Sequence, residues 1–158
     1  MAAPDRSTET RLRRAAIRLC LARLWAPVAE MSLPNGRRAD ILAVQPDGRI
    51  VIIEVKSSRR DFETDRKWPE YLDYADFLFF AVAADFPQAI LPSETGLILC
   101  HEDAAEIVRD APMTPLAPAR RRSILIAQAR LAALRLALKD DPKAAPLAGM
   151  DPASLRPD

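Results

Sequence analysis

The chain has 158 residues, enough for one domain with a buried core. Hydrophobic residues make up 49% and charged residues 28%, as in an ordinary globular protein, and a formal net charge of +1 gives no overall field for nucleic acid. The two cysteines, Cys20 and Cys100, are too few for a disulfide framework, and a single histidine, His101, argues against a zinc-ligand set. With neither a signal-like apolar leader nor an apolar run of about 18 residues, we expect a cytoplasmic protein that does not enter a membrane.

The first element is a helix over residues 6–26, which Pro27 ends. Four apolar residues recur at helical spacing and are predicted to form a buried stripe: Ile17, Cys20, Leu21 and Leu24. Three arginines fall on the opposite face: Arg11, Arg14 and Arg18. Residues 1–5 are predicted to be a loose tail.

Three strands are expected next, at residues 28–33, 37–44 and 49–56. The triplets Pro34-Asn35-Gly36 and Pro46-Asp47-Gly48 separate them, and both have the composition of turns. This part of the chain therefore predicts two consecutive hairpins.

The remaining elements alternate between helix and strand. A helix at 61–67, capped by Asp61 or Ser58, precedes a helical stretch at 69–75, and a strand at 77–83 is apolar enough to be buried on both faces. After a loop at 85–95 we expect strands at 97–100 and 104–109 and a long helix at 119–139. The prediction is one α/β domain over residues 1–139, followed by a disordered tail at 140–158.

The segment that carries chemistry is Glu54-Val55-Lys56 at the end of the third strand. Alternate side chains of a strand share a face, so Glu54 and Lys56 point the same way. Burying both charges in such an apolar strand is costly unless they are paired or bind a ligand. The preceding strand contains another carboxylate, Asp40.

The turn between these two strands fixes their register. A three-residue loop, Pro46-Asp47-Gly48, suits a type I turn with Gly48 in the left-handed position. Gln45 then faces Arg49, and counting back places Asp40 opposite Glu54, with Cα atoms roughly 4.5–5.5 Å apart. Lys56 would lie opposite Arg38 on the same face.

Two carboxylates and the backbone carbonyl of Val55 are oxygen ligands that suit Mg²⁺ or Mn²⁺. Such a metal would neutralise phosphate charge and activate water, while Lys56 would orient the water or stabilise developing negative charge. Arg37, Arg38 and Lys67 are candidate phosphate contacts. The chemistry predicts phosphodiester hydrolysis.

Asp40 followed by Glu54-Val55-Lys56 on adjacent strands resembles the signature of PD-(D/E)XK nucleases. The resemblance implies a restriction-endonuclease-like core, a central mixed β-sheet flanked by helices, with metal bound by the acidic residues and a catalytic lysine. Ala39 departs from the proline of the signature. Members often add an acidic residue from the first helix or strand; Glu30 is our candidate, and Glu9 the weaker one.

A more extended set of residues resembles the MmcB family of DNA repair proteins. It comprises Glu30, the segment 37–40, the segment 54–58, Asp61-Phe62, Asp65, Lys67-Trp68, Tyr71 and Gly96-Leu97-Ile98. This resemblance implies a role in DNA repair, with DNA and other repair proteins as partners. It does not by itself imply cleavage.

Several alternatives stay open at this point. The chain is a metal-dependent nuclease acting in DNA repair, or a catalytically inactive DNA-binding or adaptor protein with the same fold. Asp40, Glu54 and Lys56 could instead form a structural salt bridge. Trp68 and Tyr71 either stack on bases or pack on the sheet, and the run Arg120-Arg121-Arg122 either holds phosphate or is solvated. The oligomeric state is not predicted.

Overall fold

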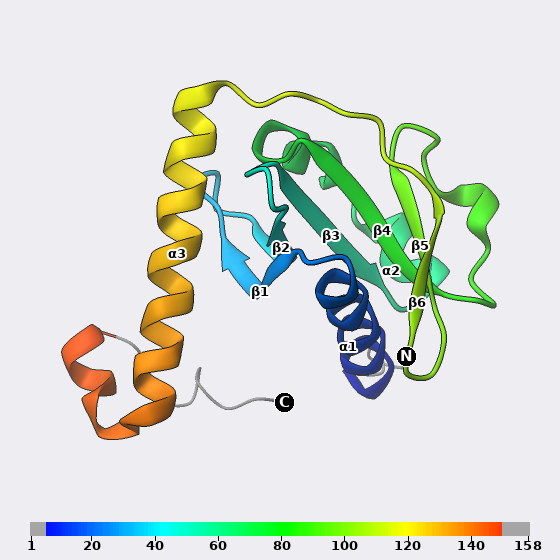
Figure 1. Cartoon of the computed structure of the whole chain (residues 1–158). Coiled ribbons are helices and arrows are strands. Elements are labelled where there is room, and N and C mark those ends of the chain that lie inside the picture. The colour runs from blue at the N-terminus through cyan, green and yellow to red at the C-terminus, as the bar shows by residue number, and fades with distance from the viewer. Residues whose placement is uncertain (1–5, 150–158) are drawn as a thin grey trace.

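A computed structural model describes residues 6–149 of the chain (Figure 1). The strands are β1 (Ala26–Ser32), β2 (Arg38–Val44), β3 (Ile50–Lys56), β4 (Phe77–Ala83), β5 (Gly96–Cys100) and β6 (Ala105–Arg109). The α-helices are α1 (Arg6–Ala22), α2 (Arg59–Thr64) and α3 (Pro118–Asp140), and the 3-10 helices are η1 (Trp68–Tyr74), η2 (Gln88–Ile90) and η3 (Pro142–Ala148). No helix in this part of the chain is long and apolar enough to cross a membrane.

The strands form one six-stranded sheet in the order β1-β2-β3-β4-β5-β6. β1, β2 and β3 run antiparallel, β3, β4 and β5 run parallel, and β6 returns antiparallel to β5. The switch to parallel pairing follows from the crossover that α2 and η1 make between β3 and β4. The mixed sheet flanked by helices confirms the expected α/β fold and is compatible with a restriction-endonuclease-like core.

Each face of the sheet carries its own core. Leu12, Ala16 and Cys20 of α1 pack on one face against the side chains of Ile41 and Ile53. The opposite face is covered by η1 and α3, which pack against a second set of buried residues: Leu42, Ile50, Ile52 and Leu78. The strand β4 is buried on both faces, as its apolar sequence predicts.

The helix α1 ends at Ala22, earlier than predicted, because the chain reverses before Pro27. Leu24 adopts a left-handed φ of 59°, and the Trp25 N–H donates to the Cys20 carbonyl at 2.8 Å, which closes the helix end. The predicted buried stripe is wrong in its second half: Leu24 lies beyond the helix and is 79% exposed, and Leu21 lies within the helix but off its buried face and is 58% exposed.

Local hydrogen bonds define the next helix and the last one. Ser58, rather than Asp61, caps α2, since its Oγ accepts from the Asp61 N–H at 3.1 Å. Within the segment where we expected a tail, η3 is capped by Asp141, whose carboxylate accepts from the Lys143 N–H at 3.2 Å, and Ala145 is fully buried. Residues 1–5 and 150–158 of the expected tails lie outside the described residues.

The long helix α3 stands against the β1 edge of the sheet (Figure 1). The Arg135 guanidinium donates to the carbonyls of Ala29 and Glu30, and the Gln128 amide donates to the Ala26 carbonyl at 3.3 Å. Ile124 and Leu138 are the α3 side chains that become fully buried. The helix is thus held along one face, and the opposite face is left uncovered.

Asp76 joins four segments of the fold. Its side chain is 1% exposed and accepts hydrogen bonds from the N–H groups of Ile50, at 2.8 Å, and Leu116, at 3.1 Å. The Arg121 guanidinium binds both of its oxygens. Arg121 is therefore explained by this buried ion pair rather than by a phosphate. Burial alone would raise the pKa of Asp76, but the hydrogen bonds from Arg121, Ile50 and Leu116 outweigh it and hold the pKa low.

Candidate functional site

The site begins where the pairing of β2 and β3 stops. The two strands pair from Val44–Ile50 to Ile41–Ile53, and the next pair in this register is Asp40–Glu54. The turn behaves as predicted: the Gln45 N–H donates to the Arg49 carbonyl at 2.8 Å, and Gly48 has a φ of 85°. The register expected from the sequence is confirmed over the paired residues, which end at Ile41–Ile53. The β2–β3 pairing does not extend to the expected Arg38–Lys56 pair.

Beyond Ile41–Ile53 the two carboxylates take over the hydrogen bonding. The Val55 N–H donates to Asp40 Oδ2 at 2.8 Å, and the Asp40 N–H donates to Glu54 Oε1 at 3.1 Å. Because the N–H and C=O of an extended residue point to the same strand edge, the Val55 carbonyl is also directed toward β2. The strand ends thus bring together Asp40, Glu54 and the Val55 backbone.

Burial and mutual repulsion act on the ionisation of both carboxylates. Glu54 is 3% exposed, and burial followed by the charge of Asp40 raises the pKa of Glu54 well above its usual range. Burial also raises the pKa of Asp40, against the opposing effects of the Val55 N–H and the Lys56 charge. Two negative charges at this position are costly, and a bound cation would offset that cost.

Lys56 lies on the same strand face as Glu54 and is 5% exposed. Its Nζ lies 2.6 Å from Asp65 Oδ2, at the C-terminal end of α2. Burial alone would lower the pKa of Lys56, but the hydrogen bond and charge of Asp65 outweigh it and raise the pKa. Asp65 belongs to the sequence pattern of the family resemblance, yet the sequence alone did not identify it as the partner of Lys56.

The aromatic residues Trp68 and Tyr71 pack on the sheet, as in the second of the two interpretations, rather than being free to stack on bases. Trp68 meets Phe80 edge-on with ring centroids 5.9 Å apart. Tyr71 is 6% exposed, and its hydroxyl donates to the Arg38 carbonyl at 3.0 Å. Burial and the nearby charges of Glu54 and Asp40 raise the pKa of Tyr71, so its hydroxyl stays protonated beside the carboxylates.

Glu30 and Glu9, the two candidates for an additional acidic residue of the site, differ in their surroundings. Glu30 has a left-handed φ of 52°, and its carboxylate lies 3.5 Å from the Arg13 guanidinium and 3.7 Å from that of Arg38. Glu9 of α1 is close enough for its charge to raise the pKa of Asp40. The structure thus gives Glu9, the weaker candidate from the sequence, an electrostatic effect on Asp40.

The three predicted nucleic-acid contacts lie outside the buried site. The Arg37 guanidinium binds Glu70 at 2.7 Å, the Arg38 side chain is 65% exposed, and Lys67 is exposed.

A groove of about 920 Å³ runs past Arg38, Glu9 and Glu30. It is also lined by the arginines of the exposed α1 face: Arg11, Arg14 and Arg18. Arg18 is paired there with Asp103 at 2.7 Å.

The donor set of the site suits a hard cation that keeps open positions. Within residues 6–149, no cluster of three or more histidine, cysteine, aspartate or glutamate side chains could hold a metal ion. Two carboxylates from adjacent strands and one carbonyl form a small oxygen set, and Mg²⁺ commonly fills its remaining positions with water or phosphate. Asp40, Glu54 and Val55 therefore fit such an ion better than a zinc or iron centre.

The fold and the site together define an α/β protein compatible with the restriction-endonuclease-like fold, with two carboxylates and a lysine where two central strands end. The chain belongs to the MmcB-like family of DNA repair proteins, whose family model matches residues 2–143. A similar solved structure is the SPO1766 protein of unknown function from Silicibacter pomeroyi, with 42% identity, a TM-score of 0.83, and coverage of 86% of this chain and 93% of that chain. No curated protein matches. The family assignment points to a role in DNA repair.

Proposed function

We propose that the protein is a metal-dependent DNA nuclease that hydrolyses phosphodiester bonds during DNA repair. The observation that carries this proposal is that the carboxylates of half-buried Asp40 and buried Glu54 lie together where β2 and β3 end, beside a buried lysine, Lys56. Perturbed carboxylates of this kind concentrate at functional sites. Family membership supports DNA as the substrate.

Each residue has a definite role in this proposal. Asp40, Glu54 and the Val55 carbonyl would hold Mg²⁺ or Mn²⁺, which when bound neutralises phosphate charge and lowers the pKa of a coordinated water. Lys56 donates hydrogen bonds to a phosphate oxygen and stabilises its developing charge. To do so it exchanges part of its contact with Asp65 for the substrate. Arg37, Arg38 and Lys67 bind the neighbouring phosphates of the strand.

A second candidate is a catalytically inactive DNA-binding or adaptor protein with the same fold. The observation that favours it is the closed state of the site: Lys56 is tied to Asp65 at 2.6 Å and Glu54 is 3% exposed. In that case the charged cluster stabilises the ends of β2 and β3, and DNA or a repair protein binds elsewhere.

The test is cleavage of single-stranded, duplex, flapped and branched DNA in Mn²⁺ by the wild type and by Asp40→Asn and Lys56→Met variants. Lys139→Met, at an exposed position on α3, is the matched control. The nuclease proposal expects cleavage by the wild type and Lys139→Met that both site variants lose. Equal weak cleavage by all proteins indicates a contaminant, and DNA binding without cleavage by any of them supports the second candidate.

A further inference from the structure

The outer face of α3 carries apolar side chains that nothing in the described structure covers. Ile126 is 51% exposed and Leu136 63% exposed, and the alanines between them, Ala129 and Ala133, are exposed as well. The spacing 126, 129, 133 and 136 places all four on one helix face, in the pattern of a helix–helix seam. We define these four residues as the α3 seam.

We propose that the α3 seam binds a second copy of this chain, with the two helices antiparallel about a two-fold axis level with Leu131. The seam is self-complementary in that arrangement, as a two-fold interface requires. Ile126 and Leu136 lie equally far from Leu131 along the helix, and so do Ala129 and Ala133. Each large side chain therefore meets a large one of the other copy, and the alanines let the helices approach at the centre.

The charges at the two ends of the seam are complementary in the same arrangement. Arg122 and Asp140 continue the seam in the two directions, are equally far from Leu131, and are both exposed. The antiparallel pairing therefore brings Arg122 of each copy to Asp140 of the other, twice per dimer. A parallel pairing would instead set arginine beside arginine and aspartate beside aspartate.

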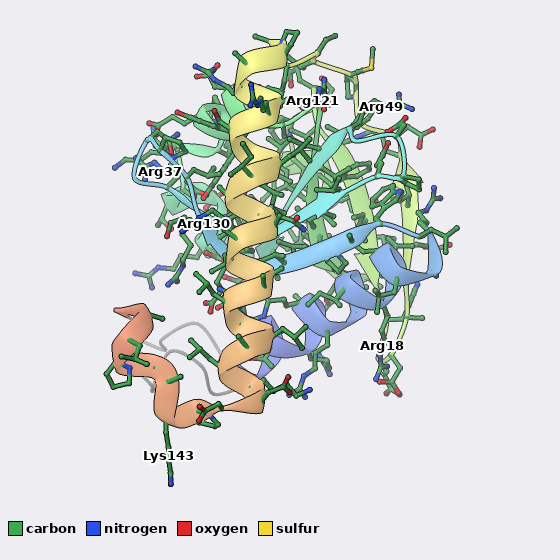
Figure 2. All side chains as sticks on the ribbon, turned by 60° about the vertical axis from the view of Figure 1, so that its left-hand side comes forward. Arg18, Arg37, Arg49, Arg121, Arg130 and Lys143 are labelled. Atoms are coloured by element: carbon green, nitrogen blue, oxygen red, sulfur yellow. The ribbon has the colours of Figure 1, made fainter. Side chains whose placement is uncertain are left out.

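A third match comes from η3. Leu147 is 91% exposed, and an apolar groove of about 800 Å³ lies beside the other end of α3, lined among others by Met31, Leu33, Ser123 and Ala127. In Figure 2, η3 and the β1–β2 hairpin that carries Arg37 lie on the same side of α3, at its opposite ends. A two-fold axis perpendicular to both helices reverses the helix direction, but η3 and the hairpin of both copies stay on the same side of the helix pair. It therefore brings the Leu147 of each copy to the groove of the other copy.

Arg130 opposes the association and lowers the affinity of the dimer. Arg130 is exposed, one position from Leu131, and lies on that same side of the helix (Figure 2). In the proposed dimer the two Arg130 guanidinium groups therefore approach each other near the axis. Like charges there weaken the dimer. We therefore expect a dimer that dissociates on dilution and that Arg130→Gln tightens severalfold.

Sedimentation velocity on the full chain over a wide concentration range measures this association. The wild type is expected to pass from monomer to dimer, whereas Leu136→Glu and Leu147→Glu remain monomeric at the highest concentration. Leu21→Glu, at a comparably exposed apolar position on α1, is the matched control and is expected to dimerise like the wild type. Circular dichroism establishes that each variant is folded.

Charge reversal tests the antiparallel register. Arg122→Asp and Asp140→Arg should each weaken the dimer at least severalfold, and the double variant should regain most of the wild-type association. A wild type that stays monomeric throughout, a Leu136→Glu variant that dimerises normally, or a double variant no better than the single ones would each overturn the proposal. None of these measurements depends on nuclease activity.

Discussion

The Lys56 ammonium lies 2.6 Å from the Asp65 carboxylate, and only 7% of the lysine side chain is exposed, against 25% for the aspartate. The contact ties the end of β3 to the end of α2, on the face that carries Asp40 and Glu54. Burial makes each partner dependent on the other, because a charge left alone in this environment is poorly solvated.

We expect Asp65→Asn to lower the free energy of unfolding by about 1–3 kcal/mol, because it leaves the buried Lys56 charge without a counterion. Urea unfolding at neutral pH measures the change. Glu63→Gln, which removes the exposed i,i+4 partner of Arg59, is the control and should cost less than about 0.5 kcal/mol. Equal effects of the two substitutions would contradict a special role for the buried pair.

The raised pKa of Glu54 predicts a pH dependence of stability. A carboxyl group with a folded-state pKa above its unfolded value stabilises the protein fully below the unfolded pKa, and this contribution is lost as pH rises through the folded pKa. Without metal, the wild type should therefore lose stability on the order of 1–3 kcal/mol as pH rises from about 4.5 through the raised pKa. Glu54→Gln should remove most of this dependence and be the more stable protein at the alkaline end.

The measurement is a series of urea titrations across that pH range for the wild type and Glu54→Gln, with chelator present. Glu106→Gln, at an exposed position on β6, serves as the control and should follow the wild type. Parallel curves for the wild type and Glu54→Gln would mean that Glu54 ionises normally in the folded protein.

How much of the site the sequence predicts depends on how far apart its parts lie in the chain. The turn Pro46-Asp47-Gly48 and the alternation of side chains along a strand determine the Asp40–Glu54 register, and both are local. The Lys56–Asp65 contact depends on how α2 docks after β3, and the Asp76–Arg121 pair joins residues 45 positions apart. No local pattern encodes such contacts.

The end of α1 shows a different reason for a wrong prediction. Helical periodicity continues through Leu21 and Leu24, so the sequence predicts a buried stripe there. The left-handed turn at Leu24, a conformation that non-glycine residues seldom adopt, ends the helix and leaves Leu24 exposed. Leu21 lies within α1 but off the buried face that Leu12, Ala16 and Cys20 form, so it is exposed as well. Propensity rules point to Pro27 instead, because they do not include the hydrogen bond from the Trp25 N–H to the Cys20 carbonyl.

Asp76 provides a stability prediction that does not involve the candidate site. Asp76→Ala removes the acceptor of two backbone N–H groups and the partner of Arg121, so we expect a loss of about 3–5 kcal/mol. Because the pKa of Asp76 is lowered, its contribution is present above the unfolded pKa and is lost as pH falls through the folded pKa. The exposed neighbour Asp73 provides the control: Asp73→Ala should cost less than about 1 kcal/mol.

Metal binding links the raised pKa values to the proposed function. A divalent cation must displace protons from Asp40 and Glu54, so the apparent affinity for Mn²⁺ should rise with pH across the raised pKa values. Isothermal titration calorimetry at several pH values measures this affinity, and the proton release that accompanies binding appears as a dependence on buffer ionisation enthalpy. Asp40→Asn and Glu54→Gln should each weaken binding at least about tenfold.

The candidate additional acids provide the comparison within this experiment. Glu9→Gln should weaken Mn²⁺ binding to a smaller extent, since the charge of Glu9 acts on Asp40, whereas Glu30→Gln should have less effect because Glu30 pairs with Arg13 and Arg38. Binding that is independent of pH, or that survives loss of both strand carboxylates, would place the ion elsewhere. The nuclease proposal would then fail, because a nuclease of the proposed type needs its metal held by Asp40 and Glu54. The DNA repair role would then rest on the binding of DNA or a repair protein.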